Sequence, residues 1–289
     1  MNIVGYGGGT DSTAMLVGLW QQHVPVDLIL FADPGAEQPH TYHYLRIMDQ
    51  WLREHGMPGI TRVWYTDRQG QRLTLEQECL RSASLPSIAY GWKKCSLKHK
   101  VAPQEKFCAH YPPCQNAWAR GENVVKLIGY DAGEEKRRLG ALPHDLADRK
   151  YQKAYPLMEW GWDRNRCIQE IQNAGLPLPG KSSCFFCPSM KRREIRTLYH
   201  QYPDLLARAL AIEDRARPNL LTVRGLGRNY AWRDCIEADQ AQQAIPGVFS
   251  SENLPCSCSK ETEKANRKDV AQDGNDCRGS QGCAGSPNR

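Results

Sequence analysis

NIVGYGGGTDST, residues 2–13, carries the strongest structural signal of this chain. Residues 2–6 are predicted to form a strand and residues 12–22 a helix, with three consecutive glycines in the turn between them. Glycine lets the backbone approach a ligand closely and adopt positive φ. The helix that follows points free N–H groups and the positive end of its dipole at that ligand. We therefore predict a phosphate-binding loop composed of Gly7, Gly8, Gly9, Thr10, Ser12 and Thr13.

A second strand and turn follow this loop. Residues 26–31 are almost wholly apolar, which is typical of a buried parallel strand, and the spacing of apolar residues predicts a helix over 40–55. Open parallel sheets bind ligands at the carboxyl ends of their strands. The candidate catalytic residues at these ends are Asp11, Ser12 and Asp33. For the two aspartates the functional interpretation is magnesium binding or substrate orientation, and the alternative is turn and capping chemistry.

Strands and helices continue to alternate along the chain. Further strands are predicted over 61–65 and 124–129, with a helix over 72–83 between them. This order indicates an α/β fold with a doubly wound parallel sheet. Residues 84–123 interrupt the order as an insertion that carries Pro and Cys. Later helices are predicted over 164–174, 190–200 and 203–216, and the last two belong to a smaller helical lobe.

Several segments resemble one family of proteins. The order G-G-x-D-S in the first loop resembles the PP-loop of the ATP pyrophosphatases. Residues 31–42, FADPGAEQPHTY, resemble the F-A-D-T-G-x-E-x-P-x-T-Y segment of the phosphoadenosine-phosphosulfate (PAPS) reductase family. Residues 94–103, KCSLKHKVAP, look like the C-C-x-x-x-K-x-x-P element of its iron–sulfur members, with Lys94 in place of the first Cys. Further similar segments are GYDAGEEKRR at 129–138, PLMEWGW at 156–162 and CFFCP at 184–188.

The resemblance covers about residues 2 to 217 and implies a fold and its ligands. The implied fold is adenine nucleotide α-hydrolase-like, and the implied cofactors are ATP and Mg²⁺. Gly129 and Arg137 are expected to contact the nucleotide. The implied organisation is a nucleotide-binding domain over 1–217 with the insertion at 84–123 and a C-x-x-C lobe at 175–217, an extension over 218–249 and a tail over 250–289. The tail is polar, with little to bury, and is predicted to be disordered.

The chain has twelve cysteines, which in a cytoplasmic protein favours metal binding or catalysis over disulfides. Cys184 and Cys187 have the spacing that lets both thiolates face one ion. The family resemblance places Cys95 at the same site. We therefore predict a metal centre of Cys95, Cys184 and Cys187 that holds a 4Fe–4S cluster, with Zn²⁺ as the alternative. Candidates for a fourth ligand are Cys79, Cys108, His110 and Cys114, and an iron without a protein ligand is the alternative.

The function implied by the resemblance is cleavage of ATP between its α and β phosphates. The acceptor would be adenylated and would then receive a nucleophile, plausibly sulfur. The implied partners are an adenine nucleotide, a nucleic acid or nucleotide as acceptor, and a sulfur-donor protein. One alternative is an assimilatory sulfonucleotide reductase, although such enzymes have a degenerate first loop and a catalytic E-C-G element that this chain lacks. Another is a non-catalytic module that binds zinc or nucleic acid on the same fold.

Composition agrees with an anionic ligand. The chain has 289 residues and a net charge of +6, and residues 250–289 are neutral, so the charge lies on the preceding part. A basic excess suits a nucleotide or a nucleic acid. No apolar run has transmembrane length, and the first strand begins where a signal peptide would lie, so we expect a cytoplasmic protein with no membrane partner.

Overall fold

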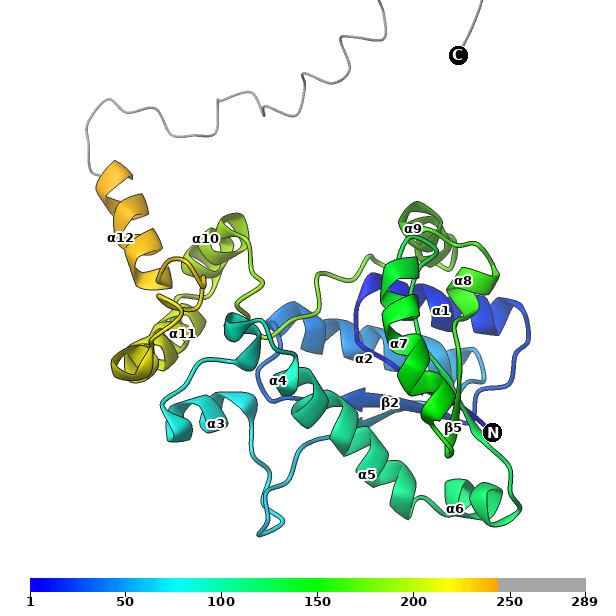
Figure 1. The fold of residues 1–289 in the computed structure, drawn as a ribbon. Helices are drawn as coiled ribbons and strands as arrows, with labels where there is room; N and C mark the ends of the chain where they lie inside the picture. The colour runs from blue at the N-terminus through cyan, green and yellow to red at the C-terminus, as the bar shows by residue number, and fades with distance from the viewer. Residues whose placement is uncertain (244–289) are drawn as a thin grey trace, which may run out of the picture. The chain divides into compact units, whose positions relative to one another are not determined.

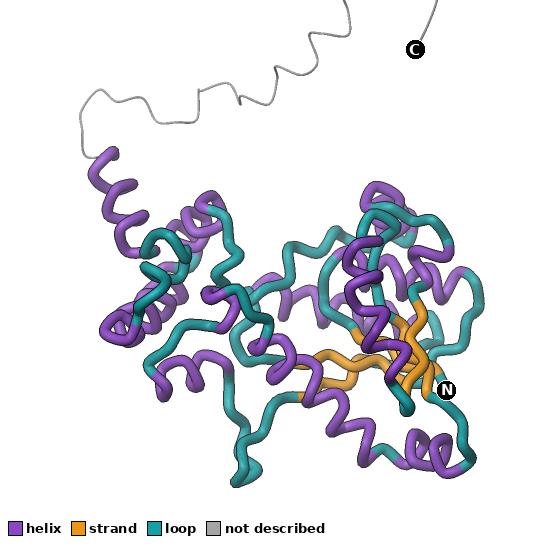
Figure 2. Tube along the Cα trace, in the orientation of Figure 1, coloured by secondary structure: helices purple, strands orange, loops and turns teal. Residues whose placement is uncertain are grey.

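A parallel sheet lies at the centre of the part of the chain that the structure, a computed structural model, describes, which is residues 1–243 (Figure 1). Its strands stand in the order β3-β2-β1-β4-β5. They are β1 (Asn2–Gly5), β2 (Leu28–Ala32), β3 (Ile60–Val63), β4 (Val124–Leu127) and β5 (Tyr151–Ala154). The predicted α/β fold with a doubly wound parallel sheet is confirmed, since helices lie on both sides of the strands (Figure 2).

The register of the sheet explains the apolar second strand. Ile3 of β1 pairs with Leu28 of β2 on one side and with Lys126 of β4 on the other. All five residues of β2 are buried, as expected for a strand covered on both faces. β5 is the strand that the sequence did not indicate, because Tyr151 is the only fully buried residue of its four.

One face of the sheet is covered by helices that flank the first and second strands. They are α1 (Thr10–Gln21), α2 (Pro39–Glu54), α8 (Pro156–Glu159) and α9 (Arg164–Asn173). A Cβ added to Gly18 of α1 would lie 2.3 Å from Trp160, so the helix backbone touches that indole directly. Asp163 begins α9 by accepting a hydrogen bond from the backbone N–H of Arg166 at 2.8 Å, as its N-cap position predicts.

Residues 84–123 differ from the expected insertion because they are largely helical. They contain the turn η1 (Ser87–Tyr90), α4 (Lys94–Ser96), the π-helix η2 (Leu97–Val101), α5 (Ala102–His110) and α6 (Pro112–Ala119). Helices α5 and α6 cover the second face of the sheet, where Cys108 and Cys114 are fully buried with Ile3 and Leu30. Both helices have proline in their first turn, which suits that position but obscures the helical pattern in the sequence.

The predicted smaller helical lobe is present. Its helices are α3 (Leu75–Ser82), α10 (Arg192–Gln201), α11 (Pro203–Ala216), η3 (Arg217–Asn219) and α12 (Trp232–Gln243). They surround a core of their own that includes Phe185, Phe186, Ile212 and Trp232. Glu213 is 1% exposed in this core, and its carboxylate accepts hydrogen bonds from three backbone N–H groups.

Met1–Asp239 forms one compact unit that contains both the sheet and the residues of the lobe core. The predicted domain boundaries at 217 and 249 stay predictions. The tail over 250–289 lies outside the described residues. Among the described helices, none combines the length and the apolar composition that crossing a membrane requires.

Candidate functional site

A cavity of about 590 Å³ opens at the carboxyl edge of the sheet. Gly7 and Gly9, which follow β1, line one side of it, and Ile128 and Gly129, which follow β4, line another. The chain leaves β1 toward β2 on one side and β4 lies on the other, so the cavity occupies the point where the strand order reverses. Open α/β sheets bind their ligands at that point, and the volume is that of a small-molecule site.

The glycine loop takes the form that a phosphate cradle needs. Gly8 has φ +73°, and a Cβ at this position would lie 3.1 Å from Cγ2 of Thr41. Gly9 is the N-cap of α1 and has no side chain to cap it. The N–H groups of Gly9, Thr10 and Asp11 therefore lack intrahelical partners and are free to bind an anion at the positive end of the helix.

Ser12 and Gly129 hold the two sides of the loop together. The N–H of Gly7 donates to Oγ of Ser12 at 3.3 Å, and that hydroxyl donates to the carbonyl of Gly9 at 3.2 Å. A Cβ added to Gly129 would lie 3.0 Å from the backbone N and Cα of Ser12. Gly129 thus lets the end of β4 pass close to the loop, while its predicted contact with a nucleotide stays a prediction.

Thr13 lies on the other side of the helix from the cavity. Its side chain is fully buried, and its hydroxyl is 3.1 Å from the hydroxyl of Tyr6 in the core. Its N–H donates to the carbonyl of Gly9 within the first turn of α1. Both polar groups are therefore occupied, and the structure does not place Thr13 among the residues that line the cavity.

Asp11 lies beside the loop in a partly acidic environment. Its carboxylate accepts a hydrogen bond from Arg164 at 2.6 Å. Burial raises the pKa of Asp11, Arg164 opposes this shift, and the charges of Asp131 and Glu134 add to it. Oε2 of Glu134 is buried and accepts no hydrogen bond within residues 1–243. These oxygens are hard donors of the type that Mg²⁺ prefers, although no three acidic side chains within residues 1–243 stand so that they could hold one ion.

Asp33, by contrast, is occupied by local donors. It is 7% exposed and accepts hydrogen bonds from the N–H of Gly35 at 2.8 Å, from the hydroxyl of Tyr42 at 2.7 Å and from Arg72 at 2.8 Å. It does not line the cavity. The geometry is that of a turn-forming aspartate, and the predicted catalytic role of Asp33 stays a prediction.

More basic than acidic side chains line the cavity, and each of the basic ones also forms an ion pair with a carboxylate. Its basic side chains are Lys100, Lys126, Arg137, Lys153, Arg164 and Lys181, against the carboxylates of Asp11 and Glu105. Burial lowers the pKa of Lys126, the charge of Glu105 opposes this shift, and the charge of Lys153 adds to it. A bound anion near Lys126 and Lys153 would reduce the repulsion between these two ammonium groups. Arg137 also pairs with Glu134 at 2.8 Å and lies over the ring of Tyr130.

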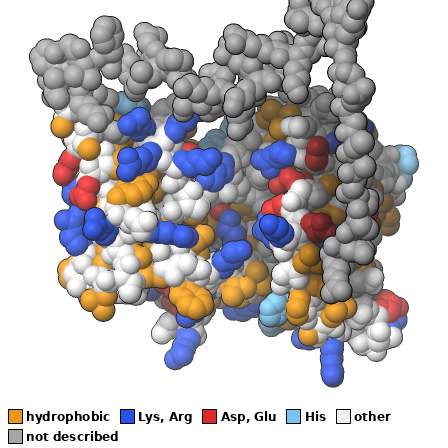
Figure 3. All heavy atoms as spheres, turned by 45° about the horizontal axis from the view of Figure 1, so that its top comes forward, with side chains coloured by type: hydrophobic (Ala, Val, Ile, Leu, Met, Phe, Trp, Pro, Cys, Tyr) orange, Lys and Arg blue, Asp and Glu red, His pale blue; other side chains and the backbone are white. Residues whose placement is uncertain are grey.

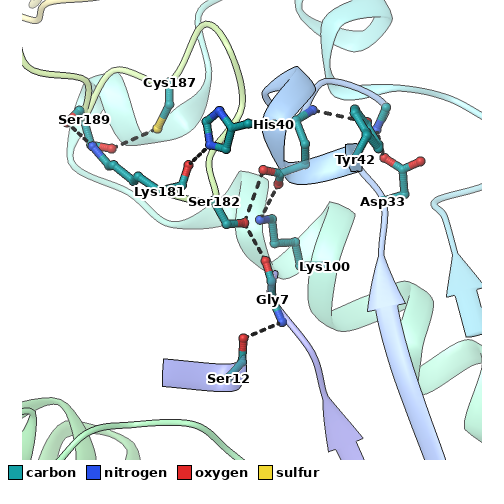
Figure 4. A network of polar contacts seen from close by, with 12 residues as sticks. Gly7, Ser12, Asp33, His40, Tyr42, Lys100, Lys181, Ser182, Cys187 and Ser189 are labelled. Atoms are coloured by element: carbon teal, nitrogen blue, oxygen red, sulfur yellow. Dashed lines mark hydrogen bonds and ion pairs between the residues drawn. The ribbon is translucent and has the colours of Figure 1, made fainter. Parts of the chain in front are cut away.

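A chain of polar contacts joins the glycine loop to the cysteine-bearing loop (Figure 4). Ser182, which precedes the C-x-x-C, donates to the carbonyl of Gly7 and lies 3.4 Å from the buried carboxylate of Glu37. Lys100 donates to the other oxygen of Glu37 at 2.7 Å and also lines the cavity. Although burial disfavours its charge, Glu37 raises the pKa of Lys100, which keeps the ammonium charged.

The three predicted metal ligands lie near one another in the lobe core. Burial raises the pKa of the Cys184 thiol well above its ordinary value, Glu37 adds to this, Lys100 opposes it, and the neighbouring Cys187 and Cys95 raise it again. Within residues 1–243, no three His, Cys, Asp or Glu side chains stand so that they could hold one ion. Cysteine sulfur is a donor that suits a cluster or zinc, but the raised pKa favours the protonated thiol of Cys184, and the geometry does not complete a three-ligand site.

The fourth-ligand candidates separate into two places. Cys79 is buried in the same core as Cys184, and burial raises its pKa to about 12, with Glu78 and Cys95 adding to the shift. Cys108 and Cys114 are buried on the second face of the sheet, and Nδ1 of His110 lies 2.8 Å from the carbonyl of Lys106. Cys79 is thus the candidate that lies with the predicted centre.

Several lining residues were not predicted. Arg164 begins α9, Lys181 and Ser182 belong to the loop before the C-x-x-C, and Lys126 and Lys153 lie on β4 and β5. Lys126 could have been recognised as a candidate site residue, because it is a lysine in an otherwise apolar strand. Arg164 gave no such signal, because an exposed arginine in a first helical turn is ordinary.

No protein-family model matches this chain, and no curated protein matches it. Among solved structures, the chain is similar to the U34-tRNA thiolase NcsA from Methanococcus maripaludis, determined with its 4Fe–4S cluster. The sequence identity is 12%, the TM-score is 0.41, and the match covers 82% of this chain and 80% of that chain. A similarity of that size carries no conclusion about the function of this chain.

Proposed function

We propose that the chain is a PP-loop enzyme that cleaves ATP between its α and β phosphates and transfers the adenylyl group to an acceptor. The observation that carries the proposal is the cavity at the reversal of the strand order, lined by more basic than acidic side chains, with the uncapped N-terminus of α1 in its wall. A triphosphate would lie on the N–H groups of the glycine loop, and basic side chains of the cavity wall would face its charge.

The chemistry would be in-line displacement at the α-phosphorus. An acceptor oxygen attacks phosphorus, the bond to the bridging oxygen breaks, and pyrophosphate leaves. Positioning and charge neutralisation supply most of the rate in such reactions. Lys126 and Lys153 line the cavity and would attract the departing pyrophosphate, and Mg²⁺ held near Asp11 would neutralise phosphate charge.

The same proposal assigns sulfur transfer as the second half of the reaction. Cys95, Cys184 and Cys187 would hold an iron–sulfur cluster, which supplies a site for sulfur beside the activated acceptor. The contacts from Gly7 through Ser182 and Glu37 to Lys100 support this, because they fix the cysteine-bearing loop against the phosphate loop.

We expect AMP and pyrophosphate as the products when the protein is given ATP, Mg²⁺ and an acceptor. The G-G-x-D-S loop lacks the Lys that a Walker loop directs at the β and γ phosphates. Chromatography of ATP labelled at the α-phosphate distinguishes the two cleavages. ADP and orthophosphate as the main products would reject the mechanism, and tight ATP binding without turnover on any acceptor would favour the non-catalytic alternative.

We expect each of the variants Cys95→Ala, Cys184→Ala and Cys187→Ala to lower the iron content of protein prepared without oxygen. The control is Cys167→Ala, since Cys167 is fully buried in the other core, against α1. Iron and acid-labile sulfide are measured with the absorption spectrum. A colourless wild-type protein with stoichiometric zinc would replace the cluster by a structural zinc site, and unchanged metal in all three variants would disprove the grouping.

A further inference from the structure

Two segments of the described residues each carry three exposed large apolar side chains, residues 139–146 and residues 92–101, and only the second of them includes an aromatic ring. Trp92 is 64% exposed, Leu97 is 60% exposed and Val101 is 39% exposed. These are three of the nine large apolar side chains that are exposed among the described residues, and they lie within ten positions of the chain. Apolar surface gathered in this way marks a binding site.

Three hydrogen bonds to Ser87 hold the turn that carries Trp92. The N–H of Trp92 donates to the carbonyl of Ser87 at 3.1 Å, and the hydroxyl of Ser87 donates back to the carbonyl of Trp92 at 3.2 Å. The same hydroxyl accepts from the N–H of Cys95 at 2.8 Å. The indole is therefore exposed on a fixed backbone, so a ligand that stacks on it loses little additional entropy in ordering the turn.

The surroundings of this indole are basic. Lys93 and Lys94 are exposed, and neither has an acidic partner in the part of the chain that the structure describes. Two further lysines follow in the same segment, of which Lys98 pairs with Glu78 and Lys100 with Glu37. Figure 3 shows Lys and Arg side chains spread over the face of the molecule that it presents.

The segment leads from the indole into the cavity. Ser96, Lys100 and Val101 line the cavity, and Cys95 lies between them and Trp92. Eight residues of helix-like backbone span roughly 12 Å. A chain of nucleotides that stacks one base on Trp92 would therefore bring a neighbouring nucleotide to the mouth of the cavity.

We propose that residues 92–101 bind a single-stranded polynucleotide, with one base stacked on Trp92 and its phosphates near Lys93 and Lys94. This rests on the proposed function, because the strand would be the acceptor of the adenylyl group. An aromatic platform beside lysines suits a single strand, whose bases are free to stack and whose backbone is anionic. Duplex bases are already stacked and would leave the indole unused.

Fluorescence anisotropy with the full chain tests this proposal. The probes are 5′-labelled RNA and DNA strands of about 15 nucleotides, near the upper end of the lengths that single-strand sites cover, and the matching duplexes. The Trp92→Ala variant is expected to weaken single-strand binding roughly tenfold or more, since stacking on one aromatic side chain supports an effect of that size. Trp64→Ala is the matched control, because Trp64 is also exposed, at 43%, but lies outside the segment.

The lysines are tested by salt dependence. In Lys93→Gln/Lys94→Gln, the slope of log affinity against log salt concentration should fall by roughly 0.7 for each lysine. Lys150→Gln should leave the slope unchanged, since Lys150 precedes β5 at the opposite edge of the sheet. Tighter binding of RNA or of DNA identifies the natural source of the strand.

The results of these measurements distinguish failure of the polynucleotide site from failure of the proposed function. Unchanged single-strand affinity in Trp92→Ala, equal loss in Trp64→Ala, or preference for the duplex would overturn the polynucleotide site. ATP affinity, measured by calorimetry, should be the same in Trp92→Ala and in the wild type. If the wild type bound the strand at Trp92 but bound no ATP, the proposed function would fail and the polynucleotide surface would stand.

Discussion

Gly8→Val is expected to lower the affinity for ATP by roughly 100-fold or more, because losing two hydrogen bonds to phosphate costs about 3 kcal/mol. Gly8 has φ +73°, which a β-branched side chain adopts only under strain. Its Cβ would also lie 3.1 Å from the Cγ2 methyl of Thr41, and the branched side chain of Val adds to this crowding, so we expect the loop to move and its N–H groups to turn away from the phosphate. Isothermal titration calorimetry with ATP and Mg²⁺ measures the effect.

The control for Gly8→Val is Gly56→Val. Gly56 has φ +69° and nothing within 4 Å of an added Cβ, so this variant carries comparable backbone strain without a clash at the cavity. Circular dichroism shows whether each variant is folded. Wild-type ATP affinity in a folded Gly8→Val protein would disprove the assignment of the loop, whereas equal losses in both variants would show that strain alone is responsible.

Glu213→Ala is expected to destabilise the helical lobe by roughly 3–6 kcal/mol, because three backbone N–H groups would lose a buried charged acceptor. Those donors belong to Leu226 at 2.7 Å, Trp232 at 2.9 Å and Arg233 at 3.1 Å. They join the loop after α11 and the start of α12 to one carboxylate that is 1% exposed. Urea denaturation followed by far-UV circular dichroism measures the loss.

Glu135→Ala is the matched control for this variant, since Glu135 is an exposed glutamate in the first turn of a helix. Its replacement should change the free energy of unfolding by less than about 0.5 kcal/mol. Glu213→Gln should be intermediate, because its side-chain oxygen still accepts hydrogen bonds but carries no charge. A loss in Glu213→Ala no larger than that in Glu135→Ala would contradict the role of the carboxylate.

The parts of the fold with regular local patterns could be predicted from the sequence. The strand over 26–31 and the helix over 40–55 lie within a few residues of β2 and α2, because burial on two faces and helical spacing leave clear marks. No such pattern in the sequence indicated β5 or α7 (Glu135–Ala147). β5 has one fully buried residue, and α7 has no buried residue at all.

Some residues of the candidate site could likewise be predicted from local sequence patterns, and others could not. The glycine loop and Ser12 were visible because positive φ and a helix N-terminus require particular residues at adjacent positions. The strand order and a loop that returns to Gly7 bring together Lys126, Arg164 and Ser182. Both features depend on contacts between distant parts of the chain, so no local sequence pattern indicates them. The position of Asp33 at a strand end suggested chemistry, and its three hydrogen-bond donors could not be foreseen from the sequence, because they come from separate parts of the fold.

The bond from Ser182 to the carbonyl of Gly7 also sets the time at which the site is completed during synthesis. The two residues are 175 positions apart in the chain. At ribosomal rates of about 5–20 residues per second, the glycine loop exists for roughly 9–35 s before its partner is made. Throughout that interval the nascent loop lacks the wall supplied by residues 180–182, so nucleotide binding should begin only after the cysteine-bearing loop has left the ribosome.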